Sequence, residues 1–254
     1  MSTPAPVFTI YKRNPAQREQ LLNQVRDTVA RQRYGTEYQP IICARRGEIT
    51  AYEALARFYD ADGECLPTQN VFEIMHDEPA LLRRAECDLK RLQLDYAPTG
   101  HDLFLNLDPH ALAAAHGQAP ALFERLINTP GVVVELIENT DIHDARAALE
   151  LHRMLSKHGV RTALDDIGAP HALLSLDLVT VVDFLKFDRS WFGRLQGRGG
   201  ELMFRAMLDF AREAGHQTVL EGIETAEMQA TARRYGINRL QGFRYRPLFR
   251  NVAP

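Results

Sequence analysis

The chain has 254 residues and a formal net charge of −3, with 45% hydrophobic and 25% charged residues. These values are typical of a soluble globular protein and argue against DNA or an anionic membrane as a partner. Because neither a signal peptide nor an apolar stretch of bilayer length is recognisable, the sequence predicts a cytoplasmic protein with no membrane partner. The three cysteines lack CxxC spacing and fit reduced packing residues.

Helical and extended patterns alternate along the chain. A short tail, 1–14, has no core-forming pattern and precedes a helix expected over 15–33. The extended runs 38–43 and 48–55 flank a turn and predict an antiparallel hairpin. Further strands are expected, in chain order, at 101–106, 132–136, 161–166, 182–187, 216–221 and 238–242. The helices expected between strands lie at about 69–93, 119–128, 144–158, 199–214 and 225–235. Since no Gly/Ser/Pro-rich linker divides these elements, 15–254 is predicted to form a single domain.

Polar residues occur at or next to the ends of the apolar runs. They are Glu53, Asn106, Glu135, Asp165, Asp166, Lys186, Glu221 and Gln241. They recur about once per βα unit, and such a unit of an eight-stranded barrel takes about 30 residues. We therefore predict an α/β fold, a TIM-like (β/α)8 barrel modified by an antiparallel first strand, with these residues on its C-terminal rim. Acids gathered at buried strand ends need compensation, and hard cations such as Mg²⁺ or Mn²⁺ would provide it.

The residues also resemble a known family, the EAL domains, which hydrolyse the bacterial second messenger cyclic di-GMP. The name-giving triplet is Glu53-Ala54-Leu55. Further matching segments follow the family's order and cover about 15 to 250: YQPI (38–41), FLNLDP (104–109), VELIENT (134–140), ALDDIG (163–168), FLKFDRS (184–190), LEGIET (220–225) and QGFRYRP (241–247).

The resemblance implies a function and a role for each matching residue. It implies hydrolysis of cyclic di-GMP to linear pGpG with two ions, Mg²⁺ or Mn²⁺. The first ion would be held by Glu53, Asn106, Glu135 and Asp165, and the second by Asp166 and Glu221. Lys186 would touch the attacking water and would form the catalytic group with Glu53 and Glu221. The substrate contacts implied are Gln39, Leu55, Arg57, Asp188 and Gln241. Glu138 would steady the loop that follows Asp165 and Asp166, and a homodimer is implied as well.

This loop departs from the family's pattern. Where the family has an aromatic residue and a glycine-rich stretch, residues 167–174 read Ile-Gly-Ala-Pro-His-Ala-Leu-Leu. Pro170 fixes φ and removes an amide donor, so we expect a stiffer loop on a different path. The chain is thus either an active phosphodiesterase or a catalytically silent module that binds cyclic di-GMP or regulates a protein partner. The retained metal-ligand positions favour the enzyme.

Structural roles are the alternatives for several of these residues. Lys186 would then pair with Asp165 or Glu135 in an ion network. Arg57 and Asp188 would form salt bridges at the rim, and Gln39 and Gln241 would satisfy loop backbone. The spacing of Met203 and Met207 indicates that both face the protein core.

Overall fold

The computed structural model describes residues 15–108, 119–136, 142–170 and 172–254. The tail 1–14 and Glu138 lie outside these ranges, so the predictions made for them stay predictions. None of the helices in the described ranges is both long and apolar enough to cross a membrane.

Eight strands close into a barrel within the described part of the chain. β1 (Tyr34–Cys43) is antiparallel to both of its neighbours, β2 (Ile49–Tyr59) and β9 (Arg239–Leu240). Between β2 and β9 the strands run parallel in chain order: β4 (Asp102–Asn106), β5 (Val132–Leu136), β6 (Arg161–Ile167), β7 (Phe184–Phe187) and β8 (Gln217–Leu220). The prediction of a TIM-like barrel with an antiparallel first strand is therefore confirmed.

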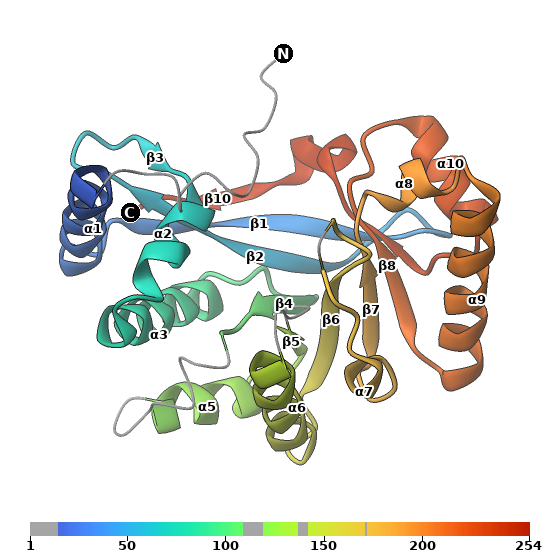
Figure 1. Ribbon diagram of the computed structural model, residues 1–254, viewed down its shortest axis with the longest axis horizontal. Coiled ribbons are helices and arrows are strands. Elements are labelled where there is room, and N and C mark those ends of the chain that lie inside the picture. The colour runs from blue at the N-terminus through green and yellow to red at the C-terminus, as the bar shows by residue number, and fades with distance from the viewer. Residues whose placement is uncertain (1–14, 109–118, 137–141, 171) are drawn as a thin grey trace.

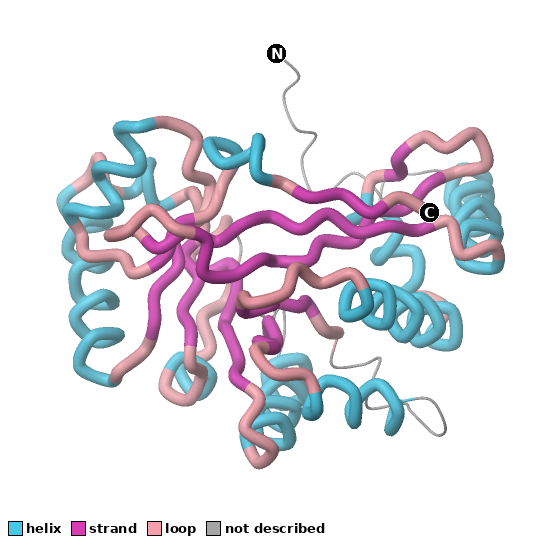
Figure 2. Tube along the Cα trace, turned by 180° about the vertical axis from the view of Figure 1, so that it is seen from behind, coloured by secondary structure: helices cyan, strands magenta, loops and turns pink. Residues whose placement is uncertain are grey.

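Helices cover the outside of the barrel. They are α1 (Pro15–Ala30), α2 (Thr68–Met75), α3 (Pro79–Asp95), α5 (Ala119–Asn128), α6 (Ile142–Ser156), α7 (Leu176–Val179), α8 (Trp191–Arg194), α9 (Arg198–Ala214) and α10 (Ala226–Arg234). Figures 1 and 2 show the long β1 and β2 crossing the molecule, with α1 and α2 near one end and α9 and α10 near the other. The edge strands β3 (Cys65–Leu66) and β10 (Arg250–Val252) extend the sheet, and a 3₁₀ turn spans Phe243–Leu248.

Three expectations about these elements were wrong. The helix expected at 69–93 is two helices, because Pro79 starts α3 and disfavours a helical conformation for the residue before it. Glu53 lies inside β2 rather than at its end, since pairing with β1 extends this strand to Tyr59. Met203 is 58% exposed on the outer face of α9, so only Met207 of the two methionines packs against the core.

One apolar layer fills the barrel interior and positions the site. Seven strands contribute one buried side chain each: Ile41, Ala51, Phe104, Val133, Ala163, Phe184 and Val219. Side chains that point into a barrel alternate with those that point outward, so the residue two positions further along each strand also faces inward. The next inward layer, toward the C-terminal ends of the parallel strands, therefore consists of the residues two positions after the apolar layer on those strands and two positions before it on the antiparallel β1.

Candidate active site

That next layer is polar, and its members are the residues predicted from the sequence. Each stands two residues from an apolar-layer residue: Gln39, Glu53, Asn106, Glu135, Asp165, Lys186 and Glu221. Gln241 follows β9 directly. Glu135 and Lys186 are fully buried, and Glu53 and Gln241 are 5% and 4% exposed. The barrel thus places carboxylates on an apolar floor, where only strong pairing can keep them charged.

Lys186 is the centre of this layer. Its Nζ lies 2.5 Å from Glu135 Oε1, 2.8 Å from Asp165 Oδ1 and 2.8 Å from Glu221 Oε1. Glu53 Oε1 lies further away, at 3.8 Å. A single ammonium group therefore faces four carboxylates, so negative charge is in excess around it.

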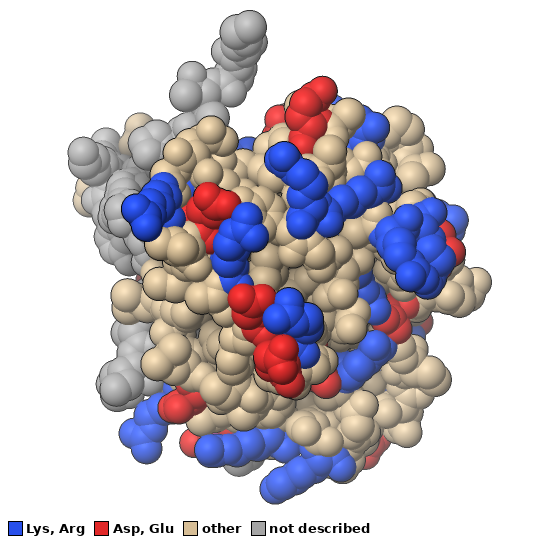
Figure 3. Space-filling view, turned by 90° about the vertical axis from the view of Figure 1, so that its right-hand side faces the viewer, with Lys and Arg blue, Asp and Glu red and all other residues tan. Residues whose placement is uncertain are grey.

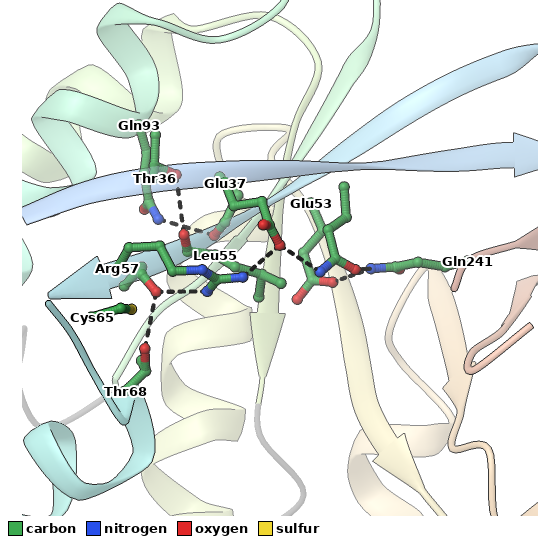
Figure 4. Close-up of polar contacts among 12 residues, drawn as sticks. Thr36, Glu37, Glu53, Leu55, Arg57, Cys65, Thr68, Gln93 and Gln241 are labelled. Atoms are coloured by element: carbon green, nitrogen blue, oxygen red, sulfur yellow. Dashed lines mark hydrogen bonds and ion pairs between the residues drawn. The ribbon is translucent and has the colours of Figure 1, made fainter. Parts of the chain in front are cut away.

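Amide side chains complete the layer. Asn106 Nδ2 donates to Glu53 Oε1 at 3.1 Å and to Glu135 Oε2 at 2.8 Å. Gln241 Nε2 donates to Glu53 Oε2 at 2.5 Å (Figure 4). Gln241 Nε2 also lies 3.5 Å from Gln39 Oε1. These bonds fix the orientation of Glu53.

Burial and charge crowding shift the pKa values of these groups. Burial raises the pKa of Glu135 and of Glu221 well above the usual range, against the attraction of Lys186. Burial also acts to raise the pKa of Glu53, but Lys186 and the hydrogen bonds from the two amides outweigh it, so this pKa is lowered. Burial lowers the pKa of Lys186, but the carboxylates of Asp165, Glu135 and Glu221 dominate and raise it well above the usual value. The carboxylates therefore favour the charged form of Lys186.

The acids form two groups of three that share Asp165. Glu53, Glu135 and Asp165 each bring a carboxylate oxygen within 4.8 Å of the others, and so do Asp165, Asp166 and Glu221. Glu135 Oε1 and Asp165 Oδ1 are buried and have no hydrogen-bond partner within the described residues, although both face Lys186. Oxygen donors in such groups suit hard divalent cations.

Asp166 has an unusual backbone conformation. Its φ of 56° places it in the left-handed region, at the irregularity where the pairing of β6 with β7 shifts. Burial of its carboxyl group and the charge of Asp165 raise the pKa of Asp166 to about 7, although the residue as a whole is exposed. The strained turn brings two consecutive acids to the same opening, which an extended strand would place on opposite faces.

The polar layer opens into a cavity of ≈ 390 Å³. Of the predicted residues, its lining includes Gln39, Glu53, Leu55, Asn106, Asp165, Asp166, Glu221 and Gln241. Arg189, Glu224 and Phe243 also line it and were not singled out from the sequence. Arg189 and Glu224 lie three residues beyond Lys186 and Glu221, so each of these strand ends carries a second residue to the opening.

Two predicted substrate contacts lie outside this lining. Arg57 Nη2 forms an ion pair with Glu37 Oε1 at 2.5 Å, and Nη1 donates to the carbonyl oxygen of Ala56 (Figure 4). Asp188 Oδ1 accepts from the backbone amide of Ser190 at 2.8 Å and so stabilises the turn after β7. The sequence analysis did not single out Glu37, although it lies on the same face of β1 as Gln39. Glu37 Oε1 accepts a hydrogen bond from Gln39 Nε2 at 2.8 Å.

Arg57 instead lines a second cavity of ≈ 410 Å³, which shares Leu55 and Asn106 with the first. Its wall contains a buried ion pair on α3, in which Lys90 Nζ lies 3.2 Å from Glu86 Oε2. The sequence did not predict this pair, because charged residues four positions apart on an amphipathic helix usually face solvent.

The start of the altered loop is held tightly. The indole Nε1 of Trp191 donates to the carbonyl oxygen of Ile167 at 2.7 Å, and Ser190 Oγ and Arg194 Nη2 donate to that of Gly168 at 2.7 and 2.8 Å. Gly168 has φ +86°, and a Cβ added there would lie 2.4 Å from the indole nitrogen. Only glycine fits this contact.

Comparisons with known proteins agree on one family. The model of the EAL domain matches residues 22–247. The chain is 27% identical over 242 residues to the bifunctional diguanylate cyclase/cyclic di-GMP phosphodiesterase MucR of Pseudomonas aeruginosa, covering 91% of this chain and 35% of that protein. It is 25% identical over 222 residues to the cyclic di-GMP phosphodiesterase PdeL of Escherichia coli, covering 82% of this chain and 60% of the relative. The chain thus spans between about a third and three fifths of these relatives.

Solved structures show the same architecture. A structure of the MucR phosphodiesterase in complex with c-di-GMP superposes with a TM-score of 0.73 at 26% identity, covering 88% of this chain and 95% of the other. The EAL domain of FimX from Pseudomonas aeruginosa, bound to c-di-GMP, gives a TM-score of 0.71 over 88% of this chain and 93% of that one. At 19% identity, this second likeness concerns the fold alone.

Proposed function

This chain belongs to the EAL domain family, and we propose that it hydrolyses cyclic di-GMP to linear pGpG with two divalent cations. The observation that carries the proposal is the buried acidic layer. Two groups of three carboxylates share Asp165, and every acid of the two groups except Asp166 forms an ion pair with Lys186. A ≈ 390 Å³ cavity is lined by all of these acids except Glu135. Relatives that align with most of this chain are named as cyclic di-GMP phosphodiesterases, which supports the same substrate class.

The donor set fits Mg²⁺ or Mn²⁺. Glu53, Asn106, Glu135 and Asp165 would hold one ion, and Asp166 and Glu221 the other, with Asp165 near both. Asn106 now turns its NH₂ group toward two carboxylates, so coordination through its oxygen requires rotation of the amide. When bound, two such cations lower the pKa of water and stabilise the charge that builds on a phosphodiester.

Lys186 would contribute a fixed positive charge. The surrounding carboxylates raise its pKa and so favour the protonated form, which acts as a hydrogen-bond donor rather than as a base. It would hold the attacking oxygen and offset the negative charge of the transition state. Glu53 and Glu221, with oxygens 3.8 and 2.8 Å from its Nζ, would turn these oxygens toward the incoming ions and leave the ammonium to meet the attacking water.

The substrate contacts are proposed from the same cavities. Leu55 offers an apolar surface shared by both cavities, and the amides of Gln39 and Gln241 face the first. Arg57 would grip a phosphate oxygen by exchanging its ion pair with Glu37 for the ligand. Asp188 would act by holding the turn after β7 that carries Arg189.

A cyclic di-GMP receptor without catalysis is the second candidate. The position of Lys186 favours it, since an ammonium that contacts four carboxylates competes with incoming cations. The hydrogen bonds that hold the loop after Asp166 favour the receptor as well. They restrict how far Asp166, a member of the second group of three acids, can move to bind a cation. A homodimer remains a prediction of the family resemblance, and a regulatory protein partner remains a prediction from the sequence.

Turnover with separate Mg²⁺ and Mn²⁺ titrations tests the proposal. The enzyme should form pGpG with half-maximal rate at millimolar rather than micromolar metal, because Lys186 must be displaced from its carboxylates. Glu135→Gln should abolish product, whereas Glu124→Gln, an exposed change on α5, should not. Binding of cyclic di-GMP without turnover would make the chain a receptor. Full activity at micromolar Mg²⁺ would contradict the competition between Lys186 and the metal.

A further inference from the structure

The opposite mouth of the barrel holds a larger cavity. Its volume is ≈ 650 Å³, and it is bounded by the end of β1 at Cys43, the start of β8 at Gln217 and the start of β9 at Arg239. Cys43 and Gln217 stand two positions from the apolar-layer residues Ile41 and Val219, on the side away from the acidic layer. Arg239 pairs with Val219 and so lies level with the apolar layer. The cavity is thus separated from the candidate active site by the apolar floor of the barrel.

Arginine dominates the lining of this cavity. Arg45, Arg46, Arg233 and Arg239 line it, and no acidic residue is among the lining residues described. Two of them are paired: Arg46 Nη2 lies 2.5 Å from Glu48, and Arg239 Nη1 lies 3.3 Å from Asp102. Arg45 and Arg233 have no carboxylate partner within the ranges that the structure describes.

The two unpaired arginines are set up differently. Arg45 is exposed in the turn after β1. Arg233, on α10, donates from its Nε to the carbonyl oxygen of Ala44 at 2.6 Å, and its terminal nitrogens make no hydrogen bond within the described residues. Asn238 adds an amide whose Oδ1 already accepts from Thr218, so its NH₂ is left to donate. The cavity therefore offers donors in excess of acceptors.

Backbone amides in the wall of the cavity also favour negative charge. Cys43 lines the cavity, and backbone amides of the turn, chiefly that of Arg46, lower the pKa of its thiol against the effect of burial. A site that stabilises a thiolate stabilises other anions at that place. Figure 3 shows that basic side chains on the α9 and α10 side of the molecule are interleaved with acidic ones, so the surface there is not uniformly basic. The acid-free lining is what distinguishes the cavity.

We propose that this cavity is a binding site for a phosphorylated small molecule of nucleotide size. Guanidinium groups bind phosphate in a two-pronged manner, which a point charge does not reproduce. The volume lies within the range of pockets that enclose small ligands. The site involves neither the acidic layer nor a metal, so the proposal does not depend on the catalytic one.

Protection of Cys43 from alkylation tests the site directly. The intact chain is treated with iodoacetamide in EDTA, with inorganic phosphate, pyrophosphate or GMP present, and labelled peptides are quantified by mass spectrometry. Exposed Cys65, on β3, serves as the internal reference, and NaCl at equal ionic strength controls for screening. We expect pyrophosphate or GMP to slow labelling of Cys43 at least threefold and to leave Cys65 unchanged. Protection by GMP beyond pyrophosphate would show that the nucleoside contributes.

Charge-reversal variants assign the effect to the arginines. Arg45→Glu should abolish protection, and Arg233→Glu should do so as well if its melting temperature shows that it folds. Arg198→Glu, an exposed change at the start of α9 outside this lining, should keep it. Three results would overturn the proposal: equal slowing of both cysteines, full protection in Arg45→Glu, or no protection by any probe. The probes are tested up to about 10 mM, a concentration that detects binding of millimolar affinity.

Discussion

Replacing Lys186 by methionine should destabilise the metal-free protein strongly. The side chain is fully buried, and its Nζ lies within 2.8 Å of oxygens from Glu135, Asp165 and Glu221. Removing one member of a buried ion pair costs about 3–5 kcal/mol, because the remaining charge is left without compensation. Three close carboxylates argue for the upper half of that range, and protonation of the most strongly shifted acids limits the loss.

Urea unfolding in EDTA and in Mn²⁺ measures this effect. For a chain of this size, a loss of about 4 kcal/mol corresponds to a fall of about 10 °C in melting temperature. Mn²⁺ should restore most of the loss, since divalent cations would compensate the same oxygens and binding to the folded state alone adds stability. A loss below about 1 kcal/mol in EDTA would refute the central role of Lys186 in this charge balance. An equal loss with and without Mn²⁺ would refute the proposed cation site.

Three further changes test other parts of the structure. Gly168→Ala should lower the free energy of unfolding in urea by about 1–3 kcal/mol, because it adds a Cβ 2.4 Å from an indole nitrogen at φ +86°. Gly159→Ala, where φ is +75° but the surrounding space is open, should lower it less. Burial lowers the pKa of His152, so its contribution to the free energy of unfolding should decrease as pH falls below about 6.5. Asp166 titrates in the same window with the opposite sign, so the contribution is measured as the difference between the parent protein and His152→Gln. Lys90→Met should cost about 3–5 kcal/mol, whereas the double change with Glu86→Leu should cost less, and additive losses would contradict a buried pair.

The barrel and its acidic layer could be predicted because both follow from alternation along strands. Glu135 and Lys186 each stand two residues beyond a buried apolar residue. The alternation of side chains that marks a strand therefore also predicts that both side chains point into the barrel. The antiparallel start was recognisable from two extended runs around a short turn. The parallel crossovers then fix the order of the remaining strands.

Contacts between distant segments could not be predicted. The ion pair of Arg57 with Glu37 depends on the register of β1 against β2, which sets Glu37 opposite Leu55. The left-handed turn at Asp166 arises from an irregular pairing with β7 that no local pattern announces. Met203 fits the helical period of α9 but is exposed, and the sequence does not show which turns of α9 pack against the barrel.

The most direct test of the catalytic account is hydrolysis of cyclic di-GMP in ¹⁸O-labelled water. Protein loaded with Mn²⁺ is compared with Glu53→Ala, and the product is analysed by mass spectrometry. Attack of water on phosphorus predicts pGpG carrying one ¹⁸O atom in its terminal phosphate, absent with the variant. Unchanged cyclic di-GMP after prolonged incubation, with the protein folded and Mn²⁺ bound, would contradict the account.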